Sequence, residues 1–132
     1  GVLIQGAAGT PAASGLEIEE LSAAETLDAD DDILVLVGEV YATTDLVETA
    51  LEVNGTRAIS FAADTTAGDD VAVVWSDGSN SYLGVLNIAS VVDVSSAATM
   101  ASGDTTLTTI AELTGVDIST SGTIVAGNFD LY

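Results

Sequence analysis

The spacing of apolar residues along the chain predicts mainly short strands. Residues 16–21, LEIEEL, alternate at first between apolar and acidic side chains, which indicates a half-exposed strand. Residues 33–37 are five consecutive apolar residues, a pattern typical of a strand buried on both faces. Further strands are expected at 57–63 and 107–115, and shorter ones at 2–4 and 123–125. Residues 22–32, SAAETLDADDD, are interpreted as a polar turn with a run of charge.

One segment, about residues 45–53, has the pattern of a helix. Its apolar residues share one helical face: Leu46, Val47, Ala50 and Leu51. Asp45 followed three residues later by Glu48 fits a capping box at the start, and Asn54-Gly55 fits a stop. A helix of two to three turns is too short to be stable alone, so it needs a sheet to pack against.

A β-hairpin is predicted where two β-rich runs, 71–75 and 82–88, flank the turn-rich SDGSNS. The order of elements predicts an α+β fold with a mostly antiparallel sheet and the one short helix packed on it. We divide the chain into an N-terminal strand and linker, 1–15, and a single domain, 16–132, that ends in a tail.

The charge balance narrows the classes of function. The 132 residues include 21 Asp and Glu, one basic residue, Arg57, and no His or Cys, for a formal net charge of −20. Such a chain repels nucleic acid and anionic membranes, and no apolar run is long enough for membrane insertion. Without His, Cys or Lys the usual catalytic bases and nucleophiles are missing, so we expect no enzyme. This composition is typical of secreted proteins and of proteins from salt-rich cytoplasm.

Acidic residues are the candidate cation ligands, and calcium is the candidate cation. Asp28, Asp30, Asp31 and Asp32 resemble the start of a calcium loop. Ile33 stands where an EF-hand needs glycine, so an EF-hand is rejected and an irregular site or a solvated acidic loop remains.

Other candidates have simpler structural interpretations. Asp77-Gly78 is first of all a turn dipeptide, and Asp69 and Asp70 are expected to start a strand. Trp75, the only tryptophan, is expected in the core or at its rim, with ligand stacking as the alternative.

Three stretches resemble the C-terminal domains of bacterial surface and extracellular proteins exported by the type I route, such as S-layer and adhesin-like proteins. They are GDDVAVVWSDGSNSYLGVLNI at 68–88, TLTTIAELTGVD at 106–117, and the ending AGNFDLY at 126–132. The resemblance implies an uncleaved C-terminal signal read by type I export machinery, with Phe129, Asp130, Leu131 and Tyr132 as its last residues. It also implies an extracellular or cell-surface location.

The resemblance and the N-terminal sequence together suggest a self-assembling subunit of a filament or surface layer. Val2, Leu3 and Ile4, followed by a linker of small residues, are expected to add as a strand to the sheet edge of a neighbouring copy. If the tail forms a last strand, Phe129 and Leu131 would be buried and Asp130 exposed. The alternatives are a surface or filament subunit of a halophilic archaeon, a monomeric adhesin or carbohydrate-binding module using Trp75 and Tyr82, and a virion surface component.

Overall fold

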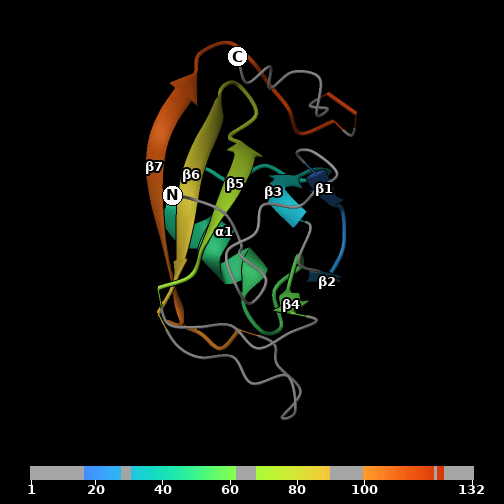
Figure 1. Ribbon diagram of the computed structural model, residues 1–132. Coiled ribbons are helices and arrows are strands. Elements are labelled where there is room, and N and C mark those ends of the chain that lie inside the picture. The colour runs from blue at the N-terminus through green and yellow to red at the C-terminus, as the bar shows by residue number, and fades with distance from the viewer. Residues whose placement is uncertain (1–16, 28–30, 62–67, 90–99, 121, 124–132) are drawn as a thin grey trace.

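The computed structural model describes residues 17–27, 31–61, 68–89, 100–120 and 122–123. Within them the chain is mostly β, with one short helix (Figure 1). A five-stranded sheet has the order β1-β3-β5-β6-β7, and a two-stranded sheet pairs β2 with β4. The elements are β1 (Glu17–Leu21), β2 (Glu25–Leu27), β3 (Asp31–Leu36), α1 (Thr44–Leu51), β4 (Ile59–Phe61), β5 (Asp70–Ser76), β6 (Ser81–Ile88) and β7 (Thr105–Leu113).

The main sheet is mixed, so the expectation of a mostly antiparallel sheet is wrong. The hairpin β5–β6 and the pair β6–β7 are antiparallel as expected. The pairs β1–β3 and β3–β5 are parallel, and so is β2–β4. Parallel neighbours need crossover connections. The segment holding β2 makes the first crossover, and α1 and β4 make the second. β2 lies where the sequence indicated only a polar turn, so that interpretation is corrected too.

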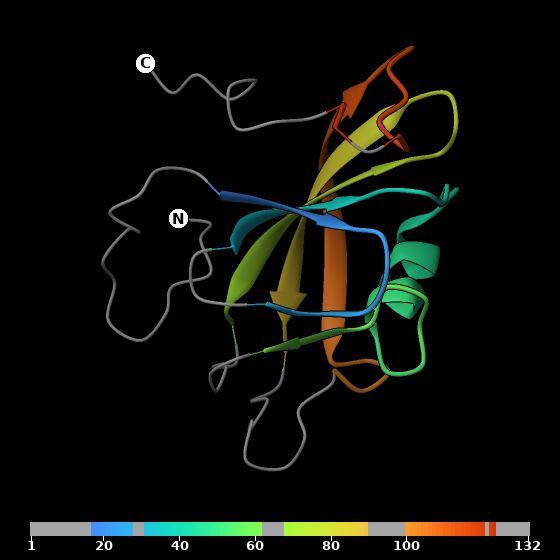
Figure 2. The same cartoon turned by 90° about the vertical axis from the view of Figure 1, so that its right-hand side faces the viewer.

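The main core fills the space between one face of the twisted five-stranded sheet and the layer formed by α1 and the small sheet (Figure 2). The helix contributes Val47, Ala50 and Leu51, and the small sheet contributes Leu27 and Ile59. From the main sheet come Leu34, Leu36, Val71, Val73, Trp75, Leu86, Ile88 and Leu107. The short helix is therefore stabilised by packing on a sheet, as its length required.

Strand β3 is buried on both faces, as its continuous apolar run predicted. Leu34 and Leu36 face the main core, whereas Ile33, Val35 and Val37 belong to a second apolar cluster on the opposite face. That second cluster is completed by Val74 and Ile118, with partly buried residues around it. A central parallel strand of this kind needs apolar residues at every position.

The helix begins one residue earlier than the sequence suggested, and the capping box is not formed. The N-cap is Thr43, whose hydroxyl accepts a hydrogen bond from the Leu46 N–H at 3.3 Å. Glu48 turns instead toward β7, as described below. After the helix, Asn54 has a φ of +66°, and a side chain on Gly55 would meet the Ala50 carbonyl oxygen at 2.2 Å. The helix ends at Leu51, shortly before the stop expected at Asn54-Gly55, and this dipeptide makes a tight turn after it.

Arg57, the only basic residue, is a buried structural cross-link. Its side chain donates to the backbone carbonyls of Leu21 (2.9 Å), Val37 (2.8 Å) and Thr56 (3.1 Å), so it joins the ends of β1 and β3 to the loop after α1. Its carboxylate neighbour, Glu39, lies 3.6 Å away and is 41% exposed. Hydrogen bonds from Thr56 and then from Tyr41 lower the pKa of Glu39. Burial is the main reason that the pKa of Tyr41 is raised.

Trp75 is a core residue, as the simpler interpretation expected. It is 2% exposed and stacks on Tyr82, with ring centroids 5.4 Å apart and ring planes inclined by 22°. Gly84 lies against the indole, because a Cβ there would meet the ring at 2.9 Å and the Leu107 side chain at 3.0 Å. The indole faces are therefore unavailable as a platform for a ligand.

Candidate assembly surface

The last strand of the sheet, β7, is exposed on both faces over most of its length. Thr105 and Leu107 are buried under α1, but every residue from Thr108 to Leu113 is exposed. Ile110 is 60% exposed and Leu113 is 45% exposed. We call residues 108–113 the β7 edge. Two large apolar side chains are thus exposed on this strand.

The start of β7 and the turn before it are held by two carboxylates, one in α1 and one just after α1. The Glu48 side chain accepts a hydrogen bond from the backbone N–H of Leu107. Glu52 is buried and accepts from the Gly103 N–H at 2.8 Å and from the Thr105 hydroxyl at 3.4 Å. A carboxylate on a backbone N–H blocks that part of a strand from pairing with another chain. The backbone N–H of Leu107 is therefore unavailable to a partner strand.

A β-bulge lies within the exposed β7 edge. Gly84 pairs with Thr109, whereas Leu83 pairs with Ala111, which leaves Ile110 as the extra residue on β7. Bulges bend and twist an edge strand. β7 is the terminal strand of the five-stranded sheet among the residues that the structure describes. Its outer side therefore carries no partner strand from that part of the chain.

A polar network at the β5–β6 turn fixes the chain that follows β7. Asn80 accepts the Gly115 N–H at 2.8 Å, and the Ser81 hydroxyl donates to the Val116 carbonyl at 2.7 Å. The same hydroxyl accepts the Ile118 N–H at 3.2 Å. The Ser76 hydroxyl donates to Asp117 at 2.7 Å. These bonds give the open end of β7 a defined position.

Ionisation states within this network follow its hydrogen bonds. The pKa of Asp77 is lowered by hydrogen bonds from the backbone N–H of Asn80 and then from the Tyr82 hydroxyl. The hydrogen bond between Tyr82 and Asp77 raises the pKa of Tyr82. The hydroxyl of Ser76 is the main cause of the lowered pKa of Asp117. Every group has a structural partner, so the network is a turn that holds the sheet together, as the Asp77-Gly78 dipeptide suggested.

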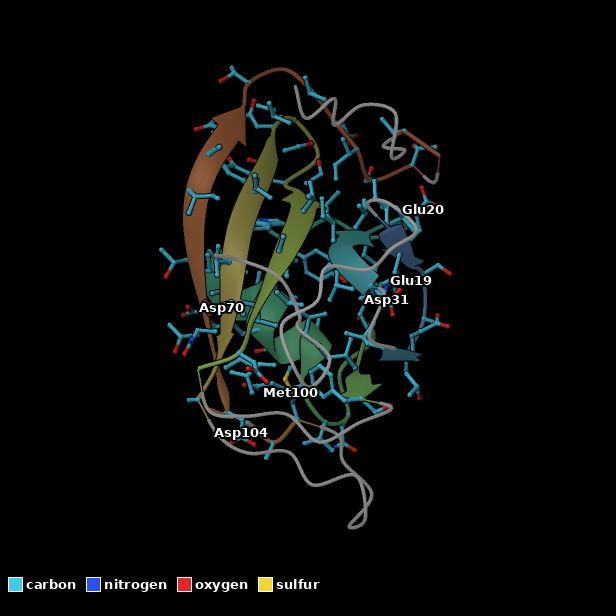
Figure 3. The ribbon with its side chains drawn as sticks, in the orientation of Figure 1. Glu19, Glu20, Asp31, Asp70, Met100 and Asp104 are labelled. Atoms are coloured by element: carbon cyan, nitrogen blue, oxygen red, sulfur yellow. The ribbon has the colours of Figure 1, made fainter. Side chains whose placement is uncertain are left out.

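The predicted calcium ligands are only partly within the described residues. Asp31 and Asp32 begin β3, whereas Asp28 and Asp30 lie outside. Among the described residues no group of three or more carboxylates gathers closely enough to hold a metal ion. Figure 3 shows Asp70 and Asp104 well apart from Asp31, Glu19 and Glu20. The calcium site at Asp28, Asp30, Asp31 and Asp32 stays a prediction.

The other predicted sites lie outside the described residues. These are the assembly residues Val2, Leu3 and Ile4, the predicted strand at 2–4, and the signal-like residues Phe129, Asp130, Leu131 and Tyr132. The short strand expected at 123–125 lies outside as well, except for Thr123. In the part of the chain that the structure covers, no helix has the length and apolar character needed to cross a bilayer.

Comparisons with protein-family models, with curated proteins and with solved structures found no match to this chain. The geometry therefore has to carry any functional argument. Glu48 and Glu52 were not expected to be partners of the β7 segment, because the spacing assigned Glu48 to a capping box and gave Glu52 no role. The exposure of β7 was not expected either. One signal was available, since TLTTIAEL lacks the strict alternation of a half-buried strand.

Proposed function

We propose that this chain is a non-enzymatic, extracellular structural subunit that assembles with copies of itself, and that the β7 edge is its acceptor site. The observation that carries this proposal is the exposure of residues 108–113 on both faces of a terminal strand. Long exposed edges promote pairing with other chains, and monomeric proteins usually block them. Here Glu48 blocks the edge at Leu107, and the block ends there.

Charge argues for a second copy of this chain as the partner, joined through its N-terminal segment. Two copies with a net charge of −20 repel each other over most of their surfaces. Residues 1–15 contain no charged side chain, and Glu112 is the only carboxylate in β7. Contact between these two segments therefore brings copies together with the least repulsion. In the proposed contact, Val2, Leu3 and Ile4 of one copy pair with the β7 edge of the next.

A contact of this kind is head-to-tail, because the donor segment and the acceptor edge are different surfaces. Head-to-tail contacts that do not close into a ring produce open filaments. The bulge at Ile110 and the block at Leu107 limit the acceptor to a few residues, which suits a short donor strand. The proposal thus accounts for the position and the length of the exposed edge together.

Two single-defect variants test the contact. Deleting residues 1–9 removes the donor and leaves the acceptor, whereas Ile110→Asp adds a charge to the acceptor and leaves the donor. Each variant alone is expected to be a folded monomer by light scattering, at a salt concentration where the wild type forms filaments in electron micrographs. Mixed together, they should form a one-to-one heterodimer, because one supplies the strand and the other the edge.

The matched control is Val53→Asp. Val53 is 42% exposed and lies just after α1, outside β7, so this change adds the same charge away from the acceptor. It should assemble like the wild type. Filaments that persist after deletion of 1–9, or a wild type that stays monomeric at every salt concentration, would refute the proposal.

Export by a type I-like route is the second part of the proposal, and it rests on the resemblance of 126–132 to the endings of exported proteins. In cells that carry a type I exporter, the wild type should reach the medium. Replacing Phe129 and Leu131 together by Asp should leave the chain inside, with assembly of the purified protein unchanged. Equal secretion of both forms would refute the proposed export signal and would leave the proposed assembly through the β7 edge untouched.

A further inference from the structure

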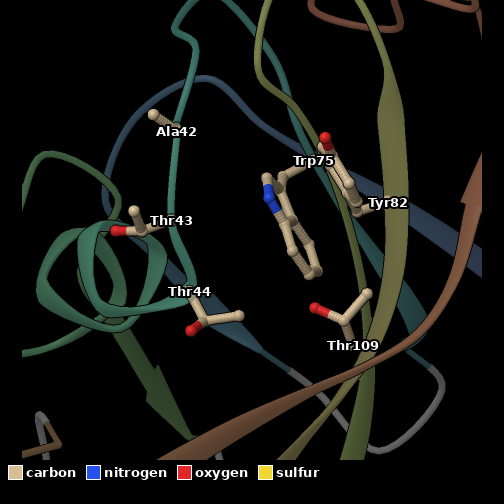
Figure 4. Close-up of a pocket in the computed structure, with 6 residues that line it drawn as sticks. All are labelled: Ala42, Thr43, Thr44, Trp75, Tyr82 and Thr109. Carbon is tan, nitrogen blue, oxygen red and sulfur yellow. The ribbon is translucent and has the colours of Figure 1, made fainter. Parts of the chain in front are cut away.

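A small pocket opens between the start of α1 and strands β5, β6 and β7 (Figure 4). Its volume is about 290 Å³, and it is lined by Ala42, Thr43, Thr44, Trp75, Tyr82 and Thr109. None of these side chains is charged, although the chain carries 21 carboxylates. The pocket arises because α1 covers Leu107 but leaves Thr109, two residues further along β7, exposed.

The indole nitrogen of Trp75 is an unused hydrogen-bond donor in this pocket. The residue is 2% exposed, and no described residue accepts a hydrogen bond from its N–H. Every fully buried side-chain nitrogen and oxygen of the described residues has a partner, so this nitrogen must touch accessible space. Figure 4 shows it on the side of the ring that faces Ala42, Thr43 and Thr44. A nearly desolvated indole N–H normally has an acceptor.

Hydroxyl groups surround this donor. Those of Thr44 and Thr109 hydrogen-bond no other described residue, so each can both donate and accept. The Thr43 hydroxyl accepts from the Leu46 N–H and keeps its own proton to donate. The Tyr82 hydroxyl is bound to Asp77 at 2.7 Å, so Tyr82 offers the pocket its ring.

We propose that this pocket binds one neutral sugar ring, either free or at the end of a glycan. Its volume lies just under the range of about 300–1,000 Å³ that suits drug-sized ligands, so a single ring fits better than an extended ligand. A pyranose offers hydroxyl oxygens to the Trp75 N–H, and hydroxyl groups to Thr44 and Thr109. Its apolar C–H surface matches the Tyr82 ring. A metal cation would lack a carboxylate in the pocket, and an anion would meet the field of a strongly acidic protein.

Because Trp75 is the only tryptophan, its fluorescence reports on the pocket directly. The probes are glucose, galactose and mannose, each compared with its uronate, together with short neutral oligosaccharides that end in the same sugars. At least one neutral sugar should give a saturable change in emission, with a dissociation constant in the millimolar range expected for so small a ligand. The matching uronate should bind about tenfold more weakly or not at all. Tighter binding of the oligosaccharide would identify a glycan end rather than a free sugar as the ligand.

Threonine-to-valine changes test the site with little change of shape. Thr44→Val and Thr109→Val should each weaken binding about 3- to 10-fold, the effect of one lost hydrogen bond. Thr106→Val is the matched control, because Thr106 is exposed on the same strand but does not line the pocket. Trp75→Phe, followed by ligand-observed NMR, should lose binding while the urea unfolding transition stays cooperative.

Three results would overturn the proposal. They are the absence of a saturable response to any of the neutral sugars, equal binding of a sugar and its uronate, and equal affinity of the wild type and the Thr109→Val variant.

Discussion

Replacing Arg57 by Met should be among the most destabilising single changes in this protein, although it removes one side chain far from the β7 edge. The side chain is 7% exposed and donates to carbonyls at the ends of β1 and β3 and in the loop before β4. Met has a similar length and no donors. The change therefore tests whether these bonds, rather than the aliphatic stem, hold the three segments together.

The size of the effect follows from the bonds that are buried. The bonds to Leu21 and Val37 are buried, and a hydrogen bond to a charged group is worth about 1.5–3 kcal/mol, which gives about 3–6 kcal/mol. Burial of the apolar Met side chain offsets about 1–2 kcal/mol of this loss. The free energy of unfolding should then fall by about 1–5 kcal/mol, out of a typical total of about 5–15 kcal/mol. At about 4 °C per kcal/mol the melting temperature should drop by about 4–20 °C.

The assay is urea unfolding followed by circular dichroism and by Trp75 fluorescence in high salt, where the extra net charge of the variant matters least. Glu39→Gln is the control, because an ion pair this exposed is worth less than about 1 kcal/mol. Arg57→Lys keeps the charge but cannot span both carbonyls, so it should lose most of the same stability. A loss below about 1 kcal/mol for Arg57→Met, or an equal loss for Glu39→Gln, would refute the reasoning.

Three further predictions concern packing, pH and salt. Gly84→Ala should lower the free energy of unfolding by about 1–3 kcal/mol, because the new Cβ would press on Trp75. The near-ultraviolet circular dichroism of the indole should change as well. An unchanged spectrum and an unchanged stability would contradict the close contact. The folded-state pKa values of Asp77 and Asp117 are lowered, so their stabilisation is complete above the unfolded pKa near 4 and is lost as pH falls through the folded values. The wild type should therefore be more stable than Asp77→Asn at neutral pH, and this difference in unfolding free energy should shrink below about pH 4. A difference that grew as the pH fell would contradict the lowered pKa of Asp77. Raising NaCl from about 20 mM to 1 M should raise the melting temperature, because salt screens the repulsion among 21 carboxylates. A melting temperature that does not change with salt would contradict this prediction. Unfolding below about molar salt would favour the halophilic alternative.

Local patterns predicted the elements better than their pairing. The apolar run at 33–37 identified β3 and its burial on both faces, and the turn dipeptide Asp77-Gly78 located the hairpin. The parallel pairs were missed because sequence neighbours suggest hairpins. Here each of the two parallel pairs in the main sheet depends on a crossover that contains a short strand, β2 or β4, of only three residues.

The candidate surface was beyond the reach of local patterns. TLTTIAEL was recognised as a strand, but its exposure depends on how far α1 extends along it, which no local rule gives. Glu48 fits a capping box by spacing alone, yet Thr43 caps the helix and Glu48 binds the Leu107 N–H 59 residues away. Likewise, no pattern around Trp75 indicates that its N–H has no acceptor among the residues that the structure describes. These properties arise from tertiary packing.

Hydrogen bonds between distant parts of the chain also set how fast the domain can fold. Glu52 and Gly103 are 51 residues apart in the chain, and Glu20 and Gly122 are 102 residues apart, yet both pairs are hydrogen-bonded. Domains dominated by contacts between distant residues fold slowly, because long loops must close before the contacts form. If the chain is exported as proposed, with either end leading, the contacts between α1 and β7 would form only after both segments have passed the channel, so the proposed acceptor edge would be completed on the far side.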